Sequence, residues 1–341
     1  MLTAKGKAPF ITRQMVVFFT ILLTYPFWAD AVGLYQYLGI EIEIFILYAL
    51  GFNLLFGYTG LPSFGHGAFL GAGAYAYGLA QHNLDAGLFG GLALAIVAGM
   101  AASGLVALFL SHRRGIYFAL MTIAFGQIFW FLAIKVRDVT GGEDGLLNIF
   151  RPVVAIGPVE VSFKSNIALY YLVAAILIVV ILLLWRLVHS PFGIAIQAIR
   201  MNETRARFAG YRVWLIKWSV FTLSGAVAGL AGGLFSMAQE SAYPDVMSLH
   251  ASGLVVMMVL IGGGFVSFWG PVVGVMVYFL ARDLLGAVTE AWLLWYGLLF
   301  MGVMMFSREG VAGAWGRFAH WFSGRSGVLP TVKNDQAERA K

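Results

Sequence analysis

Residues 87–110 read GLFGGLALAIVAGMAASGLVALFL, a run with no charged side chain. About 20 apolar residues are enough to cross the hydrocarbon core of a bilayer as a helix, which satisfies its own backbone hydrogen bonds there. Nine further runs share this character. The sequence therefore predicts an all-α, polytopic membrane protein with about ten transmembrane helices, at residues 14–36, 42–57, 61–81, 87–110, 116–136, 167–187, 213–238, 249–266, 268–287 and 291–307.

The charges between these runs are sorted by side. If the N-terminus starts in the cytoplasm and the chain crosses at every run, 17 of the 22 Lys and Arg lie inside, and 12 of the 16 Asp and Glu lie outside. Basic residues near span ends are retained in the cytoplasm during insertion. The pattern predicts cytoplasmic termini. The runs 42–57 and 249–266 are short, so a count that differs by two stays open.

Composition sets further limits. A chain that is 60% hydrophobic and only 11% charged is not a soluble domain of 341 residues. The net charge of +6 follows from membrane orientation, so we expect a lipid bilayer and no nucleic acid as a partner. The absence of cysteine excludes disulfides, thiol catalysis and thiolate metal sites.

Ionisable side chains avoid the middle of the predicted spans. Every Asp, Glu, Lys and Arg falls at or beyond a predicted span end, and His66 is the one histidine inside an apolar segment. Charges at mid-membrane cost at least about 2.5–3.5 kcal/mol on insertion scales, and they usually mark proton or ion paths. This argues against a secondary transporter, which would need ion-coupling groups. A solitary histidine also argues against a membrane-embedded enzyme.

The connections are too short to hold a soluble domain. The longest outer loop covers about residues 137–166 and the longest inner one about 188–212. We therefore expect one transmembrane domain at residues 1–322. The remaining residues, 323–341, are polar, which favours a disordered tail. Lys5, Lys7 and Arg13 precede the first run in the manner of a signal peptide, but bulky residues before the small-residue motif at 29–31 favour an uncleaved helix.

The inner stretch at residues 190–212 reads SPFGIAIQAIRMNETRARFAGYR. Pro191 follows a serine that can cap a helix, and Gly210 closes the pattern, so we expect one or two short amphipathic, basic helices here. Two interpretations stay open. The stretch could lie on anionic lipid headgroups, or it could dock a cytoplasmic partner.

Glycines recur at four-residue spacing inside the predicted helices, which predicts close packing of helix backbones. The sets are Gly67 and Gly71; Gly87 and Gly91; Gly225, Gly229 and Gly233; and Gly270 and Gly274. A short similarity, GLPSF at 60–64 and GFVSF at 264–268, precedes two of these glycine-rich helices. It is either a chance match or the trace of a parallel internal repeat, which is common in transporters.

Four motifs in order resemble the permease subunits of branched-chain amino acid ABC importers. They are GYTGLPSFGHGAF at 57–69 followed by GAGAY at 71–75, GIYFA at 115–119 with FGQ at 125–127, TGGEDGL at 140–146, and the stretch at 190–212. The similarity covers about residues 45–285. It implies a type II-like ABC importer permease in the bacterial inner membrane. Its substrate would be a branched-chain amino acid, or alternatively urea, a short amide or a small organic acid.

The resemblance also implies partners. These are a second homologous permease, two ATP-binding cassette subunits and a periplasmic or lipid-anchored substrate-binding protein. The chain has no Gly-x-x-x-x-Gly-Lys-Ser/Thr phosphate loop, so we expect no enzyme activity and no cofactor bound by this chain, with ATP used by the partner subunits. An ion-coupled secondary transporter, which would work alone, remains the alternative from another class.

Family membership would give three groups of residues a role. The ATPase-coupling positions would be Arg200, Asn202, Glu203, Ala206 and Gly210, although Thr204 and Arg205 stand where the importer pattern usually has Glu and Ala. Polar candidates for the translocation path are Asn53, Thr59, Ser63, His66 and Gln127; each could equally be an interhelical hydrogen bond. Candidates for contact with the binding protein are Thr140, Gly141, Gly142, Asp144 and Gly145, which could also form a plain turn.

Overall fold

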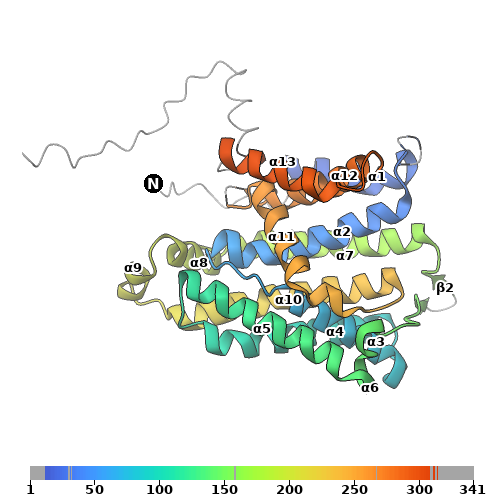
Figure 1. The fold of residues 1–341 in the computed structure, drawn as a ribbon, viewed down its shortest axis with the longest axis horizontal. Coiled ribbons are helices and arrows are strands. Elements are labelled where there is room, and N and C mark those ends of the chain that lie inside the picture. The colour runs from blue at the N-terminus through green and yellow to red at the C-terminus, as the bar shows by residue number, and fades with distance from the viewer. Residues whose placement is uncertain are drawn as a thin grey trace, which may run out of the picture.

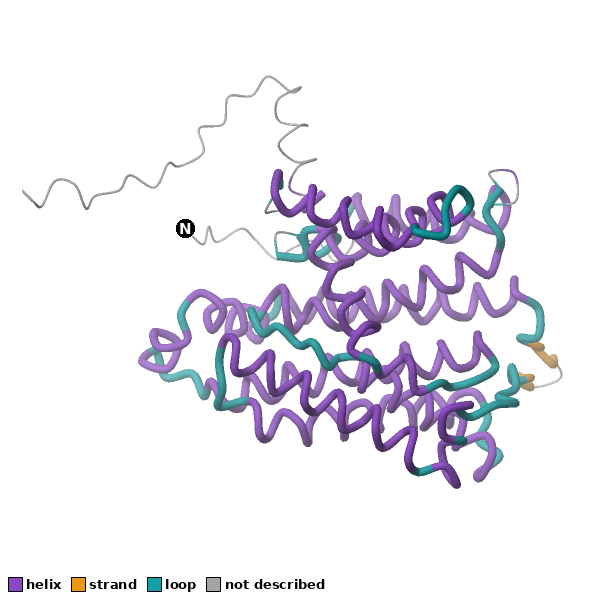
Figure 2. The backbone as a smooth tube through the Cα atoms, in the orientation of Figure 1, coloured by secondary structure: helices purple, strands orange, loops and turns teal. Residues whose placement is uncertain are grey.

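The computed structural model describes residues 12–313, except residues 30, 32, 157–158, 266, 308–309 and 312. Most of this part of the chain is helical, as the tube in Figure 2 shows. The longer helices are α1 (Arg13–Trp28), α2 (Gln36–Asn53), α3 (Gly67–Leu84), α4 (Leu88–Leu110), α5 (Gly115–Lys135), α7 (Asn166–Val188), α10 (Val213–Gln239), α11 (Leu249–Gly262), α12 (Gly270–Gly286) and α13 (Trp292–Phe306).

Each of the ten predicted apolar runs overlaps one of these helices, so the all-α prediction is confirmed. Five segments among the described residues are long and apolar enough to cross a membrane: Gln36–Tyr58, Leu88–Leu110, Gly115–Lys135, Asn166–Val188 and Val213–Gln239. The number of crossings and the side of the termini stay predictions. The predicted polar tail at 323–341 lies outside the described residues.

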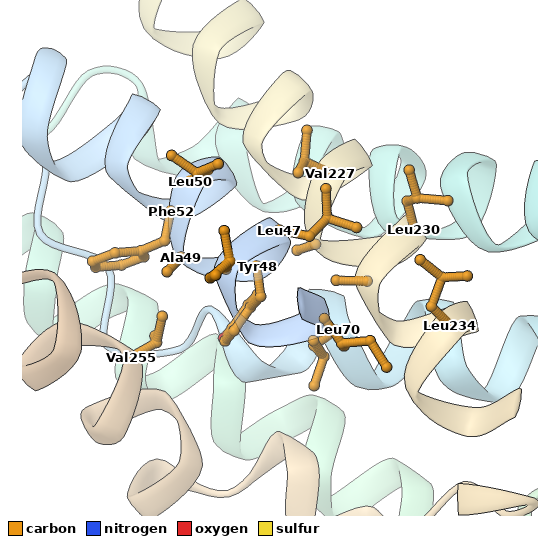
Figure 3. Packing of buried hydrophobic residues seen from close by; sticks show 14 of the residues in the cluster. Leu47, Tyr48, Ala49, Leu50, Phe52, Leu70, Val227, Leu230, Leu234 and Val255 are labelled. Carbon is orange, nitrogen blue, oxygen red and sulfur yellow. The ribbon is translucent and has the colours of Figure 1, made fainter. Parts of the chain in front are cut away.

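Helix α10 lies in the middle of the bundle and packs against α2, α3 and α4. Leu47 of α2 and Val227 and Leu230 of α10 belong to one continuous apolar core (Figure 3). Glycine allows the backbones to approach closely, because a Cβ at Gly229 would overlap the Ala95 carbonyl oxygen of α4. The glycine strip predicted on α10 is thus a helix-packing surface.

The chain between α2 and α3 is not a simple turn. Helix α2 widens into a π-helical turn, η2 (Leu54–Tyr58), and residues 59–66 then run without helical structure inside the bundle. Gly60 adopts φ +76°, which glycine tolerates far better than other residues. We call residues 54–66 the α2–α3 bend. Buried non-helical backbone at membrane depth is tolerated only where protein or a water-filled path surrounds it.

Short elements occupy the two ends of the bundle. Helices α8 (Pro191–Met201) and α9 (Glu203–Phe208) lie at one end, and a hairpin of β1 (Val153–Ile156) and β2 (Val159–Ser162) lies at the other (Figure 1). The strands pair antiparallel, with Val153 opposite Ser162. The sequence analysis did not predict this hairpin within the outer loop, which also contains α6 (Arg137–Thr140).

One expectation about ionisable residues is wrong. Helix α2 begins at Gln36, six residues before the predicted run, so Glu43 lies two turns inside a membrane-length helix. Its side chain is buried, with the residue only 2% exposed. The predicted run starts too late because it was defined by apolar residues, and the polar residues Gln36 and Glu41 lie in the first turns of the helix.

Candidate functional site

The predicted coupling segment, residues 190–212, forms two short helices with defined ends. The Ser190 hydroxyl accepts from the Gly193 N–H and Pro191 occupies the first turn of α8, as expected for a capped helix start. The Asn202 side chain caps α9 by accepting from the Arg205 N–H at 2.9 Å. Gly210 follows α9 with φ +87°, so the chain turns back there in a conformation that favours glycine.

Arg200 joins α8 to two bends in the membrane helices. Its Nη1 donates to the carbonyl oxygen of Gly57 in the α2–α3 bend and, at 3.2 Å, to that of Phe265 after α11. The guanidinium also lies over the Phe265 ring, 5.1 Å from its centroid. Partial burial lowers the pKa of Arg200, but arginine remains charged in proteins. The Arg200 side chain also lies against Gly60, so it packs beside both copies of the short sequence similarity.

Glu203 joins α9 to the membrane helices by ion pairs. Its carboxylate lies 2.8 Å from Lys217 Nζ at the start of α10 and 2.8 Å from Arg114 Nε before α5. Lys217 is 1% exposed and also donates to the Arg113 carbonyl oxygen at 3.1 Å. Arg207 completes the group with a longer contact of 3.9 Å to Glu203. Glu203 was among the candidates from sequence, but Lys217 was not; it was counted with the charges at span ends, although it lies inside the predicted run 213–238.

The coupling segment has an inner and an outer apolar side. Ala206 is buried with Ile199 and Val213 in a small cluster that holds α9 against α8 and α10. Met201 and Phe208 point outward and are 85% and 87% exposed. These two side chains present apolar surface at the end of the bundle, beyond the membrane-length helices.

Four of the five path candidates surround the α2–α3 bend. Asn53, Thr59, Ser63 and His66 are all buried, and His66 contacts the Ser224 hydroxyl of α10 at 3.2 Å. The Thr59 hydroxyl donates to the Leu54 carbonyl oxygen. The Asn53 amide, Ser63 Oγ and His66 Nδ1 have no hydrogen-bond partner among the described residues. The bend thus concentrates buried polar groups with unused hydrogen-bonding capacity.

Gln127 lies apart from this group, partly buried on α5. Its neighbour Gly126 packs against Gly65, so α5 approaches the bend through glycine rather than through Gln127. The side chains that hold the bend were not singled out from sequence. The Thr122 hydroxyl accepts from the Phe64 N–H at 3.1 Å, and the Ser252 hydroxyl accepts from the Gly67 N–H at 3.0 Å. In the sequence, Thr122 and Ser252 could have been found as isolated hydroxyl side chains inside apolar runs.

The outer glycine-rich loop is held in one shape. The Thr140 hydroxyl donates to the Ala133 carbonyl oxygen at 2.6 Å, and Leu146 pairs with Ala242 through two backbone hydrogen bonds. Gly145 packs directly against the Ala242 backbone, where a Cβ would not fit. Gly141 and Gly142 take positive φ values between these anchors, and Asp144 is exposed. The loop therefore presents an acidic side chain on a fixed backbone.

The described residues contain no cluster of three or more His, Cys, Asp or Glu that could hold a metal ion. Residues 36–307 match the sequence profile of the family described as the permease component of branched-chain amino acid transport systems. The chain belongs to this permease family. Because the match covers most of the chain, the bundle described above is the transport domain of the family, and the protein is a multi-pass membrane permease.

Individual relatives agree with this assignment. The permease is 29% identical to the high-affinity branched-chain amino acid transport system permease protein LivM of Salmonella typhimurium and to that of Escherichia coli, over 79% of this chain and 67% of each relative. It is 28% identical to the ribose import permease protein RbsC of Bacillus subtilis over 41% of both chains. No solved structure matches the permease.

Proposed function

We propose that this permease is the membrane subunit of an ATP-driven importer for branched-chain amino acids or chemically related small solutes. In this proposal two ATP-binding subunits supply the energy, and a second permease completes the translocation path. A separate binding protein delivers the substrate. The family and the two LivM relatives support the substrate class.

The observation that carries the coupling assignment is the exposure of Met201 and Phe208. Both lie on short helices outside the membrane-length helices, where exposing an apolar side chain to water is unfavourable in free energy. Apolar anchors that fill pockets of a partner contribute much of the affinity in protein interfaces. We infer that these side chains insert into the ATP-binding subunit.

Movement would then pass from the coupling segment to the membrane helices by two routes. The Arg200 route leads to the α2–α3 bend and to the turn after α11. The Glu203 route leads to α10 and to the start of α5. Nucleotide binding at the ATPases would shift α8 and α9, and the bends would open or close in response, as alternating access requires.

The bend itself is the best candidate for part of the translocation path. A zwitterionic amino acid needs uncharged polar groups along its way, and Asn53, Ser63 and His66 hold unused donors or acceptors there. The fixed outer loop at Thr140, Gly141, Gly142, Asp144 and Gly145 is our candidate contact for the binding protein, because a rigid loop loses little entropy on docking.

Single cysteines test the docking step, since the chain contains none of its own. Met201→Cys and Phe208→Cys, labelled with a photoactivatable cross-linker in native membranes, are expected to link to an ATP-binding protein. Phe150→Cys is the matched control, since Phe150 is 71% exposed in the outer loop. Adducts of residues 201 and 208 with lipid alone would contradict the docking assignment and favour the headgroup alternative.

Uptake by the purified complex in liposomes tests the substrate class. Leucine, isoleucine and valine are expected to accumulate only with ATP and the binding protein present. Urea, acetamide and a small organic acid serve as competitors from the alternative class. Accumulation driven by an ion gradient without ATP would instead mean a secondary transporter.

A further inference from the structure

A cavity of about 210 Å³ lies between α1, α2, α7 and α12, away from the coupling segment and the α2–α3 bend. Carbon atoms form nearly all of its wall, with Phe18, Leu22, Ile46 and Met276 among the lining residues. Ile21, Trp28 and Leu280 also line it and are 44%, 37% and 41% exposed. The cavity therefore opens through an apolar flank of the helix bundle, towards the surrounding lipid.

Glu43 is the charged exception in this wall. The residue is only 2% exposed, and neither carboxylate oxygen has a hydrogen-bond partner among the described residues. A buried carboxyl without a donor is costly in the low-dielectric interior of a membrane protein, and such groups usually have a function. Glu43 lines the cavity, but neighbouring side chains cover its oxygens, so a ligand must displace them to reach the carboxyl.

The neighbouring tyrosines do not fully satisfy Glu43. The Tyr170 hydroxyl lies within hydrogen-bonding reach of the carboxyl, but it has one proton, and it donates to the Leu22 carbonyl oxygen at 2.6 Å. That oxygen accepts no helical bond because Pro26, four residues later in α1, has no N–H. The Tyr25 hydroxyl donates to the Tyr35 carbonyl oxygen. The sequence of α1 thus draws the nearest donor away from Glu43.

The cavity also has a specific shape. Tyr25 and Tyr170 stack with ring centroids 5.4 Å apart, directly over Gly39 of α2. A Cβ at Gly39 would overlap the Tyr25 ring. The tyrosine pair therefore closes one side of the cavity, one turn along α2 from Glu43.

We propose that this cavity binds a primary ammonium group joined to an apolar chain, with Glu43 as its acceptor. The ammonium supplies both the missing donors and the charge that balances the carboxylate, and the apolar wall accommodates the chain. Two sources provide this chemistry: an aminophospholipid from the bilayer, through the exposed flank, and a branched-chain amino acid from solution. The assignment is independent of the coupling mechanism.

Native mass spectrometry of the full-length protein tests the proposal. The protein, with any subunits that accompany it from native membranes, is placed in nanodiscs of equal parts phosphatidylethanolamine and phosphatidylcholine. The primary ammonium of phosphatidylethanolamine has N–H groups that can donate hydrogen bonds, whereas the quaternary ammonium of phosphatidylcholine has none. We expect retention of phosphatidylethanolamine over phosphatidylcholine by about tenfold or more, as for a hydrogen bond to a charged group, and loss of this preference in Glu43→Gln.

Glu41→Gln is the matched control, because Glu41 lies two residues away on the same helix and is already paired with Arg282 at 2.7 Å. It is expected to keep the preference. Leu280→Trp narrows the mouth of the cavity from its exposed side without touching Glu43, and is expected to weaken retention even if Glu43→Gln folds poorly. Its binding is compared with that of Leu280→Ala.

A second measurement separates the two sources. Leucine is added to protein in nanodiscs of phosphatidylcholine only, and its Glu43-dependent binding would assign the site to a solute. Glu43-dependent retention of phosphatidylethanolamine would assign it to a lipid. Equal retention of both lipids by the wild type, without leucine binding that Glu43→Gln removes, would overturn the proposal.

Discussion

The two anchors of the coupling segment differ in strength and in what they hold. Arg200 is exposed, with its guanidinium only partly buried, and it donates to two neutral carbonyl oxygens, at Gly57 and Phe265. Glu203 has a side chain only 12% exposed and pairs at 2.8 Å with Lys217, which is 1% exposed. Exposed contacts exchange readily with water, whereas a buried ion pair is costly to separate.

This difference suggests that one anchor holds the coupling segment in place and the other transmits its movement. The Glu203 anchor fixes α9 to α10, the most central helix, so it is suited to keep the segment in place. The Arg200 anchor ends on the π-helical turn of the α2–α3 bend and on the turn after α11, where the regular α-helix is interrupted. A contact that can break where an α-helix is interrupted is suited to transmit movement. The two anchors should therefore differ in how much each contributes to folding stability.

The largest effect is expected for Glu203→Ala. It removes both short ion pairs and leaves Lys217 buried without a carboxylate, which should lower the free energy of unfolding by about 3–5 kcal/mol. Thermal unfolding in detergent and the amount of protein in membranes measure this. Unchanged stability would show that water already reaches Lys217 and that the anchor is not fixed.

A smaller effect is expected at the end of α9. Gly210→Val places a β-branched residue at φ +87°, which should cost about 1–3 kcal/mol of backbone strain. No side chain lies near this position, since a Cβ would meet nothing within 4 Å, so space is not the reason. Gly210→Asn is the matched control, because asparagine tolerates left-handed backbone. Equal loss in both variants would contradict the conformational explanation.

Arg200→Ala should lower stability by only about 1–2 kcal/mol, since water can reach part of the site that the guanidinium leaves. Unfolding in detergent is again the measurement, with Arg205→Ala on the exposed face of α9 as the control. A loss as large as that of Glu203→Ala would remove the distinction between a fixed anchor and a breakable one.

The smallest effect is expected for Arg207→Ala. Its contact with Glu203 is long, at 3.9 Å, and its side chain is 68% exposed, so the pair should contribute less than about 0.5 kcal/mol. Added salt should have no effect on the free energy of unfolding of this variant, and none on that of the wild type. A larger loss than for Arg200→Ala would mean that the whole cationic group, rather than the buried pair, holds α9.

The sequence predicted the helices well and the bends less well. Apolar runs located α4 and α7 to within a few residues, because long helices in lipid must be apolar nearly throughout. The same criterion joined residues 61–66 to the third helix, although the chain is not helical there, since apolar and glycine residues are shared by helices and buried loops. Glu43 was missed for the related reason that polar residues hid the start of α2.

The candidate sites depended on family resemblance more than on physical signals. Position within the motif selected Arg200 and Glu203, but nothing in the sequence indicated that their partners would be Gly57, Phe265 and Lys217. The two partners of Arg200 lie 143 and 65 positions away along the chain, and all three contacts follow from the packing of α2, α10 and α11, which a single sequence does not reveal.

In the proposed mechanism, Arg200 transmits the movement of the coupling segment. A direct test of this role measures ATP hydrolysis and leucine uptake together, in the complete complex reconstituted in liposomes with Arg200→Ala. We predict that hydrolysis stays close to the wild-type rate while uptake falls by about tenfold or more, equivalent to losing one charged hydrogen bond. Uptake that remains in the wild-type ratio to hydrolysis would contradict the account.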